Sequence, residues 1–297
     1  MHVMGGGDVG GAKTQIMNTV TGLSRTNDVM LISFRAGPFA DEARERGIDV
    51  RVIERHNPFR AARTMRDLVD EFKPDIIHCH GGRANLMGAM VRRSRRIPII
   101  TTVHSDYRLD YLGSPLKQHT LGTANAIALR FLDFYQPVAD RMARTLIERG
   151  FDPERIVKIY NGMEFNRPEG EFDRAAYLRE TYGAEIEEGD VLCGIAARLT
   201  AVKDIATTVR GFAEALKTAP QLRLFIAGDG EDADMLKKLC DQLGVRERVT
   251  FCGWVSPVMP FFRAMDINLL SSVSETFPYS ILEGVCAGCA TICSDVG

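Results

Sequence analysis

The feature that most constrains the fold is an alternation of strand and helix patterns that runs along the chain, stops and starts again. Short apolar segments predict strands, and periodic segments between several of them predict helices. This alternation favours an α/β fold, with parallel sheets covered by helices on both faces. In the first series, the expected strands are 29–34, 49–53, 76–79, 99–103, 134–138 and 157–160, and the expected helices are 13–24, 60–72 and 84–93.

A polar segment, 161–190, separates this series from the second one. It contains an acidic stretch at 185–190 and one short helical pattern near 174–181. The chain has 297 residues, which fits two domains. We predict domains at 1–163 and 164–297. The second series has expected strands at 191–197, 222–227, 249–251, 267–270 and 290–293, and expected helices at 205–217, 232–243, 257–264 and 280–287.

Composition and charge narrow the function class. Hydrophobic residues make up 45% of the chain and charged residues 26%, which excludes a disordered or fibrous protein. The net charge of −2 carries no general signature of nucleic-acid binding, so no nucleic-acid partner is expected. The charge is unevenly divided, because residues 1–150 hold 22 Lys and Arg against 16 Asp and Glu, and the remainder holds 15 against 23.

Cysteines and apolar runs bear on the compartment. The seven cysteines are odd in number and mostly lie in apolar runs, which favours reduced, buried thiols over disulfides. Cys286, Cys289 and Cys293 have a spacing like that of metal ligands, but we interpret them as small core residues. No run of 18 apolar residues predicts a spanning helix, and the first residues lack the pattern of a signal peptide. We therefore expect a cytoplasmic protein.

Loops that follow parallel strands are where such sheets bind ligands. The glycine-rich segment 5–14 allows three interpretations: a dinucleotide fingerprint, a P-loop, or a turn that lets a substrate approach the backbone. The first lacks an acid after the second strand, where Arg35 stands, and the second has Ala12 in place of a glycine. His78 and His80 share a strand face and could be a metal pair, structural residues or substrate contacts.

Charged residues follow other strands. His104 comes just after strand 99–103 and is either a ligand contact or a packing residue. Arg198 and Lys203 follow strand 191–197, and two cations there suit a diphosphate, although exposed surface cations would look the same. Glu275 and Glu283 are eight positions apart, and a carboxylate can accept two hydrogen bonds at once from a pair of sugar hydroxyls. Spacing alone also fits an acid at a helix start and an ordinary exposed Glu.

Together these motifs resemble the GT-B glycosyltransferases of family 4, in order and over nearly the whole chain. The resemblance rests on GGGDVGGAKT, DIIHCHG, TVHSD, YNGME, ARLTAVKD, FIAGDGED, VTFCGWV and SETFPYSILE. It implies two Rossmann-like domains that face each other across a cleft. It also implies a retaining transferase that moves a sugar from a nucleotide-diphosphate sugar to a glycan or lipid-linked acceptor, in surface polysaccharide or glycolipid synthesis.

The resemblance also implies residue roles. Arg198 and Lys203 would hold the donor diphosphate, Glu283 the ribose, and Glu275 hydroxyls of the transferred sugar. The amides of Thr276 and Phe277 would assist, Gly6 and Gly7 would approach the diphosphate, and His104 would contact the donor sugar near the reaction centre. No metal and no cofactor are expected. Three positions depart from the family pattern, where Ala197, Asp204 and Thr276 replace glycines.

The acceptor side and the ends of the chain give further expectations. Arg92, Arg93, Arg95 and Arg96 form a basic helix end that could contact the inner face of a membrane or a lipid phosphate. Family members continue past the end of this sequence, so we expect the second domain to be truncated. Two other functions remain open: a nucleotide-sugar epimerase on the same fold, and a non-catalytic fragment that binds a nucleotide sugar.

Overall fold

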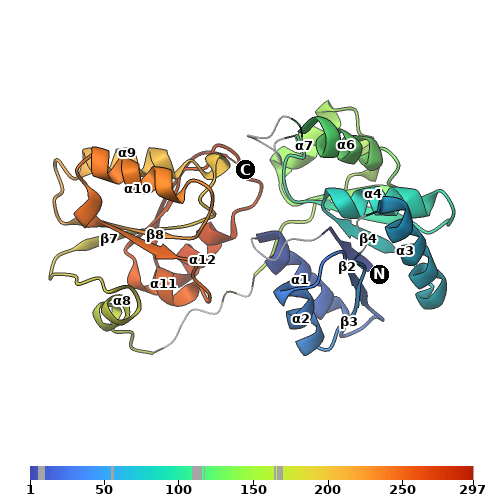
Figure 1. Ribbon diagram of the computed structural model, residues 1–297, viewed down its shortest axis with the longest axis horizontal. Coiled ribbons are helices and arrows are strands. Elements are labelled where there is room, and N and C mark those ends of the chain that lie inside the picture. Colours follow the sequence, from blue (N-terminus) through green and yellow to red (C-terminus); the bar gives the residue numbers. More distant parts are fainter. Residues whose placement is uncertain are drawn as a thin grey trace. The chain divides into compact units, whose positions relative to one another are not determined.

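The computed structural model describes residues 1–5, 11–54, 57–108, 116, 118–163, 165 and 170–296. The chain folds into two compact units, a first unit of residues 1–162 and a second unit of residues 163–296. The predicted boundary lies beside this division. Each unit is built around one parallel sheet flanked by helices (Figure 1), so the prediction of two parallel-sheet domains is confirmed. No helix in the described ranges has the length and apolar character needed to cross a bilayer.

The sheet of the first unit has the strand order β3-β2-β1-β4-β5-β6, and every pair is parallel. From β1 the chain continues to β2 and β3 on one side, and from β4 it continues to β5 and β6 on the other side. The neighbours β1 and β4 therefore form the topological switch point, where ligands of such sheets bind. The strands are β1 (His2–Met4), β2 (Met30–Ser33), β3 (Asp49–Val52), β4 (Ile77–His80), β5 (Ile99–Val103) and β6 (Phe134–Pro137).

Helices cover both faces of this sheet and bury a separate apolar cluster on each. Met65 and Met87 belong to the larger cluster, and Ile16 and Phe39 to the smaller one, on the opposite face. The helices are α1 (Gly11–Leu23), α2 (Pro38–Glu45), α3 (Pro58–Phe72), α4 (Gly82–Arg92), α6 (Thr123–Leu129) and α7 (Asp140–Glu148), with a π-helical turn η1 (Gln118–Gly122) and a 3-10 turn η2 (Pro153–Arg155).

The second unit repeats the same plan. Its parallel sheet has the order β11-β10-β7-β8-β9, so β7 and β10 flank the switch point. Figure 1 shows α9 and α10 on one side of this sheet and α11 and α12 on the other. The elements are α8 (Arg174–Tyr182), β7 (Val191–Ala196), η3 (Ala201–Lys203), α9 (Ile205–Ala215), β8 (Leu222–Ala227), α10 (Ala233–Gln242), η4 (Arg246–Arg248), β9 (Val249–Gly253), α11 (Met259–Ala264), β10 (Ile267–Leu270), α12 (Tyr279–Ala287) and β11 (Ala290–Cys293).

The expected strand at 157–160 is wrong. Val157 and Ile159 donate backbone hydrogen bonds to the carbonyls of Tyr135 and Pro137, at 2.9 and 3.1 Å, so this segment does run along β6. A parallel ladder also needs the bond in return, and Pro137 has no N–H to donate. Only an isolated bridge between Tyr135 and Ile156 remains. Three helices that the sequence did not predict are also present, α2, α6 and α7.

Candidate functional site

The candidate donor site lies in the second unit, in the loops at the carboxyl ends of β7 and β10. Arg198 and Lys203 belong to the loop after β7, and Glu275 to the loop after β10. Although 72 positions apart, Lys203 and Glu275 form an ion pair, and the Ser272 hydroxyl donates to the same carboxylate oxygen at 2.6 Å. The Glu275 side chain is only 9% exposed, so the pair holds its charges in a partly dry environment.

Hydrogen bonds join the backbones of these two loops. The Val273 amide donates to the Val202 carbonyl at 2.9 Å, and the Ser271 hydroxyl donates to the Asp204 carbonyl at 2.8 Å. Thr208, in the first turns of α9, donates to the Ser271 hydroxyl at 2.7 Å. The position of Lys203 relative to Glu275 is therefore set by the main chain as well as by the ion pair.

The loop that carries Arg198 rests on a turn, Gly228–Gly230, that follows β8. A side-chain carbon placed on Gly228 would lie 1.9 Å from the Ala197 carbonyl oxygen, and one on Gly230 would lie 2.2 Å from that of Leu199. Both glycines also have positive φ values, of 135° and 159°. Only glycine permits this approach. The Arg198 side chain is exposed, and within the described ranges it has no ion-pair or hydrogen-bond partner.

Helix α12 carries Glu283 and begins just after Thr276 and Phe277. Thr276 is buried, and both residues precede Pro278, the N-cap of the helix. Glu283 is half-buried, and burial raises the pKa of its carboxyl. No described residue makes an ion pair or hydrogen bond with this carboxylate. A shielded, unpaired carboxylate is suited to accept hydrogen bonds from a ligand.

In the first unit, His104 lines a pocket at the carboxyl ends of β4 and β5. Two of its polar lining side chains are linked, since Asn85 donates to Asn125 at 2.9 Å, and Asn85 in turn accepts a hydrogen bond from the Thr101 hydroxyl at 2.7 Å. Gly6 and Gly7, with the competing interpretations of their loop, lie outside the described residues. The pocket is lined by Gly81, Gly82, Asn85, Thr102, Val103, His104, Ser105, Tyr107, Asn125 and Leu129.

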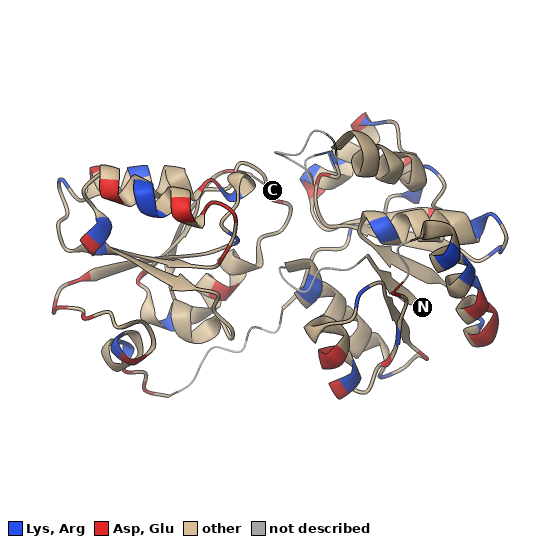
Figure 2. Cartoon of the chain, in the orientation of Figure 1, with Lys and Arg blue, Asp and Glu red and all other residues tan. Residues whose placement is uncertain are grey.

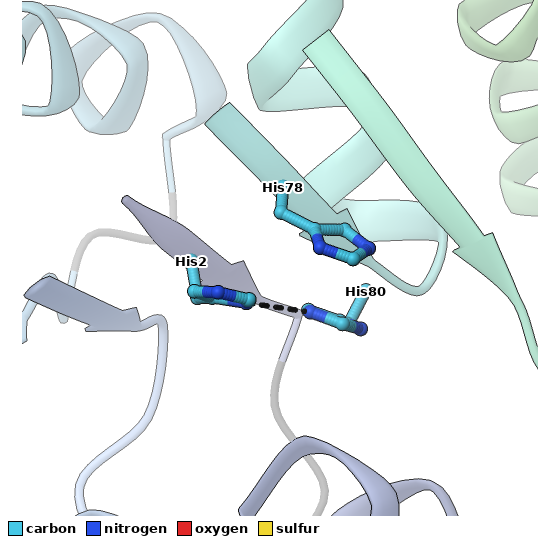
Figure 3. Close-up of side chains that lie close together, drawn as sticks. All are labelled: His2, His78 and His80. Atoms are coloured by element: carbon cyan, nitrogen blue, oxygen red, sulfur yellow. Dashed lines mark hydrogen bonds between the residues drawn. The ribbon is translucent and has the colours of Figure 1, made fainter. Parts of the chain in front are cut away.

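Beside this pocket lie four histidines, one of which, His2, was not predicted from the sequence. In-register pairing of β1 with β4 places His2 opposite His78, and His2 Nδ1 lies 3.2 Å from His80 Nε2 (Figure 3). His80 Nδ1 lies 3.3 Å from His104 Nε2. His78 Nε2 lies 2.7 Å from the Thr102 hydroxyl. Every one of these contacts joins residues that are distant in sequence.

His2, His78 and His80 could also hold a metal ion, since their ligand atoms lie within 4.8 Å of one another. A tetrahedral zinc site, with bonds of about 2.0–2.1 Å to imidazole, needs ligand atoms roughly 3.3 Å apart. The rings of His78 and His80 are stacked, with centroids 4.4 Å apart and planes 25° apart. Because nitrogen lone pairs lie in the ring planes, stacked rings do not aim at a common point. The side chains would have to reorient before they bound a metal.

The histidine cluster predicts acid sensitivity of the first unit. Burial, with a smaller contribution from charged neighbours, lowers the pKa of His78 to about 4, whereas an unfolded histidine titrates near 6.5. Unfolding therefore takes up a proton below pH 6.5, so this stabilisation is complete above that pH and is lost as pH falls towards 4. Between pH 6.5 and 5 we expect a loss of about 2 kcal/mol from His78 alone.

Urea titrations of the chain at several pH values check this expectation. The His78→Gln variant should lose about 2 kcal/mol less than the unaltered chain between pH 6.5 and 5. His119→Gln, at an exposed position on η1, is the matched control and should follow the unaltered chain. If the free energy of unfolding falls equally with pH in the unaltered chain and in His78→Gln, the lowered pKa of His78 is contradicted.

Both units match models of known protein families. Residues 9–167 match the family model described as Glycosyltransferase Family 4, and residues 183–297 match Glycosyl transferases group 1. The first match spans more than half of the chain. The chain belongs to glycosyltransferase family 4.

Curated relatives are similar over most of this chain. An uncharacterized glycosyltransferase of Methanocaldococcus jannaschii is 29% identical over 76% of this chain and 58% of its own length. The alpha-monoglucosyldiacylglycerol synthase of Streptococcus pneumoniae is 26% identical over 80% of this chain and 56% of its own length. The chain thus spans less than two thirds of the length of these relatives.

Solved structures share the GT-B fold. Anabaena HepE in complex with UDP-glucose has a TM-score of 0.85 and 21% identity, and the match covers 100% of this chain and 81% of that one. Sucrose-phosphate synthase from Thermosynechococcus elongatus has a TM-score of 0.79 and 16% identity, over 100% of this chain and 81% of that one. At these identities the likeness concerns the fold.

The departures from the family 4 pattern have a structural explanation at Asp204. This residue adopts the left-handed conformation, with φ 42° and ψ 49°, that usually favours glycine. Its carboxylate accepts a hydrogen bond from the Thr207 hydroxyl at 2.7 Å, which stabilises the turn locally. The loop therefore keeps the backbone conformation of a glycine without having one.

The basic residues at the end of α4 are partly neutralised. Arg92 binds Asp133 with its Nε 3.0 and 2.9 Å from the two carboxylate oxygens, and Arg95 binds Asp70 at 2.7 Å. In the part of the chain that the structure describes, Arg93 and Arg96 are exposed and form no ion pair. Figure 2 shows the positive charges along α3 and at the end of α4.

Proposed function

We propose that the protein is a retaining glycosyltransferase that moves a sugar from a nucleotide-diphosphate sugar to an acceptor. The observation that carries this proposal is the contact between Lys203 and Glu275 at the switch point of the second sheet. In this contact Lys203, a cation that can bind phosphate, lies next to Glu275, a carboxylate that can bind sugar hydroxyls. Arg198 belongs to the same loop as Lys203. Family membership and the UDP-glucose named for the HepE structure support the same donor class.

In this proposal Lys203 and Arg198 neutralise the charge that develops on the departing diphosphate, which is electrostatic stabilisation of a leaving group. Glu283 accepts hydrogen bonds from the ribose, Glu275 binds hydroxyls of the transferred sugar, and the amides of Thr276 and Phe277 assist. His104 contacts the transferred sugar. The sugar would pass through an oxocarbenium-like state, as in glycoside hydrolysis, with its anomeric configuration retained.

A screen of UDP-, GDP- and ADP-sugars by thermal shift tests the donor assignment, because a ligand that binds only the folded state raises the melting temperature. For the donor found, Glu283→Gln is expected to weaken binding about tenfold to a hundredfold, since a hydrogen bond to a charged group is lost. Glu247→Gln, at an exposed position on η4, is the control and should bind as the unaltered chain does. Unchanged affinity in Glu283→Gln would contradict the role of Glu283.

Donor turnover separates this function from its alternatives. Slow hydrolysis of the donor without an acceptor, together with faster release of the nucleotide diphosphate and formation of a glycosylated product when an acceptor is added, favours a transferase. A changed sugar that stays attached to its nucleotide favours an epimerase, and binding without any turnover favours a non-catalytic fragment.

We further propose that the reaction needs no bound metal, because Arg198, Lys203 and backbone amides supply the positive charge. Turnover is expected to be the same, within about twofold, with and without excess EDTA, since these groups supply the stabilisation that a metal otherwise would. Loss of turnover that returns on addition of Mg²⁺ or Mn²⁺ would contradict this.

For the acceptor we propose a glycan or lipid-linked molecule used in surface polysaccharide or glycolipid synthesis. The name of the Streptococcus pneumoniae relative supports a lipid-linked acceptor, and the exposed Arg93 and Arg96 offer charge for a lipid phosphate or an anionic membrane surface. The protein would then act in the cytoplasm, at the inner face of the membrane.

A further inference from the structure

Three histidines of the first unit form a continuous line of hydrogen bonds that ends at the pocket. His80 is the middle member: its Nε2 contacts His2 Nδ1 at 3.2 Å, and its Nδ1 contacts His104 Nε2 at 3.3 Å. His2 and His80 are 5% and 2% exposed, and His104 is half-buried and lines the pocket. Figure 3 shows the first of these two contacts.

All three rings are neutral near pH 7. Burial, assisted by the neighbouring His78, lowers the pKa of His2, His80 and His104 well below the usual value, to about 4 for His104. A neutral imidazole carries one N–H, so each ring donates through one nitrogen and accepts through the other. The direction of one hydrogen bond in the line therefore fixes the direction of the next.

Only two arrangements satisfy the line. Either all three rings carry the proton on Nδ1 and donate towards His104, or all three carry it on Nε2 and donate towards His2. In the first arrangement, His104 is left with an Nδ1–H that can donate to a ligand. In the second, its Nδ1 is an acceptor. The hydrogen-bonding character of His104 at the pocket is thus decided by its contact with a buried residue behind it.

We propose that His80 is a positioning residue that couples the tautomer of His104 to that of His2, the buried end of the same line. The proposal rests on the proposed function for one point only, namely that the ligand of His104 is the transferred sugar. His80 does not itself contact that sugar. Its role is to tie the position of the ring proton on His104 to the positions of the ring protons on His80 and His2, and so to determine whether His104 offers the sugar a donor or an acceptor.

Long-range ¹H–¹⁵N correlation NMR of the full chain, labelled on its histidine rings, tests this at pH 7, because ring nitrogen shifts distinguish the two tautomers. We expect His2, His80 and His104 to share one tautomer, with signals assigned by single substitutions. His119→Gln is the control and should leave these three signals unchanged. A mixed set of tautomers in the unaltered chain overturns the proposal.

Two variants of His80 then test its contact with His104 separately from its contact with His2. His80→Asn keeps an amide near the Nδ1 position, so it should preserve the hydrogen bond to His104 and leave kcat near that of the unaltered chain. His80→Gln places its amide near the Nε2 position and should give a mixture. We expect His80→Gln to lower kcat about twofold to fivefold with little change in KM for the donor, because only the fraction of His104 in the right tautomer is active. A single, unchanged tautomer of His104 in His80→Gln overturns the proposal.

The two proposals fail in different ways. A shared tautomer in a chain that neither binds nor turns over any nucleotide sugar supports the line of histidines and overturns the proposed function. Turnover in a chain with mixed tautomers does the reverse.

Discussion

Replacing Lys203 with alanine is expected to lower kcat/KM for the donor by about 10²–10³-fold, the usual effect of removing one preorganised group that stabilises developing charge. The lysine loses both its proposed contact with the diphosphate and its ion pair with Glu275. Steady-state kinetics with the donor found in the thermal-shift screen measure the effect. Lys217→Ala removes an exposed lysine of the same unit and should leave kcat/KM unchanged.

Lys203→Ala also leaves the shielded Glu275 without its cation, so a loss of folding could be mistaken for a loss of function. The double variant Lys203→Met with Glu275→Gln removes both charges and should recover much of the stability. If the double variant melts near the unaltered chain but remains inactive, the charges serve the reaction. If it is as active as the unaltered chain, the donor assignment is wrong.

Replacing Gly228 with alanine is expected to destabilise the second unit by about 2–5 kcal/mol, which combines overpacking with backbone strain. The added carbon would lie 1.9 Å from the Ala197 carbonyl oxygen, so either the turn or the Arg198 loop must move. Thermal and urea unfolding measure the loss, and donor affinity should fall with it because Arg198 is displaced.

Gly244→Ala is the matched control for this substitution. Gly244 also has a positive φ, of 67°, but a carbon added there meets no atom within 4 Å. It therefore measures the backbone term alone, which should cost roughly 1 kcal/mol. Equal losses in Gly228→Ala and Gly244→Ala would mean that close packing against the Arg198 loop contributes nothing.

The fold was largely predictable because parallel strands and their crossover helices leave a strong local pattern. Apolar runs of three to seven residues between periodic segments predicted the strands of both sheets other than β1, and the loops after these strands contain Lys203 and Glu275, which lie in contact. The error at 157–160 arose from a single chemical detail, since Pro137 on the neighbouring strand cannot return a hydrogen bond.

The histidine cluster was beyond sequence reasoning for a different reason. His78 and His80 share a strand face and were noticed, but His2 lies 76 positions from His78 and joins them only through the pairing of β1 with β4. Sequence spacing carries no information on strand order. The same limit applies to Asn85 and Asn125, which lie on separate helices and form a hydrogen bond at the pocket.

The left-handed conformation of Asp204 bears on which residues this position of the loop tolerates. With Asp at this position, the left-handed backbone costs about 1–3 kcal/mol of strain, but the carboxylate gains the hydrogen bond from Thr207. With Gly, the strain is absent, but the unfolded chain gains conformational freedom, which lowers the stability of the folded state. These terms oppose each other and are similar in size, so either residue is tolerated. The conformation of this loop therefore does not require glycine at position 204.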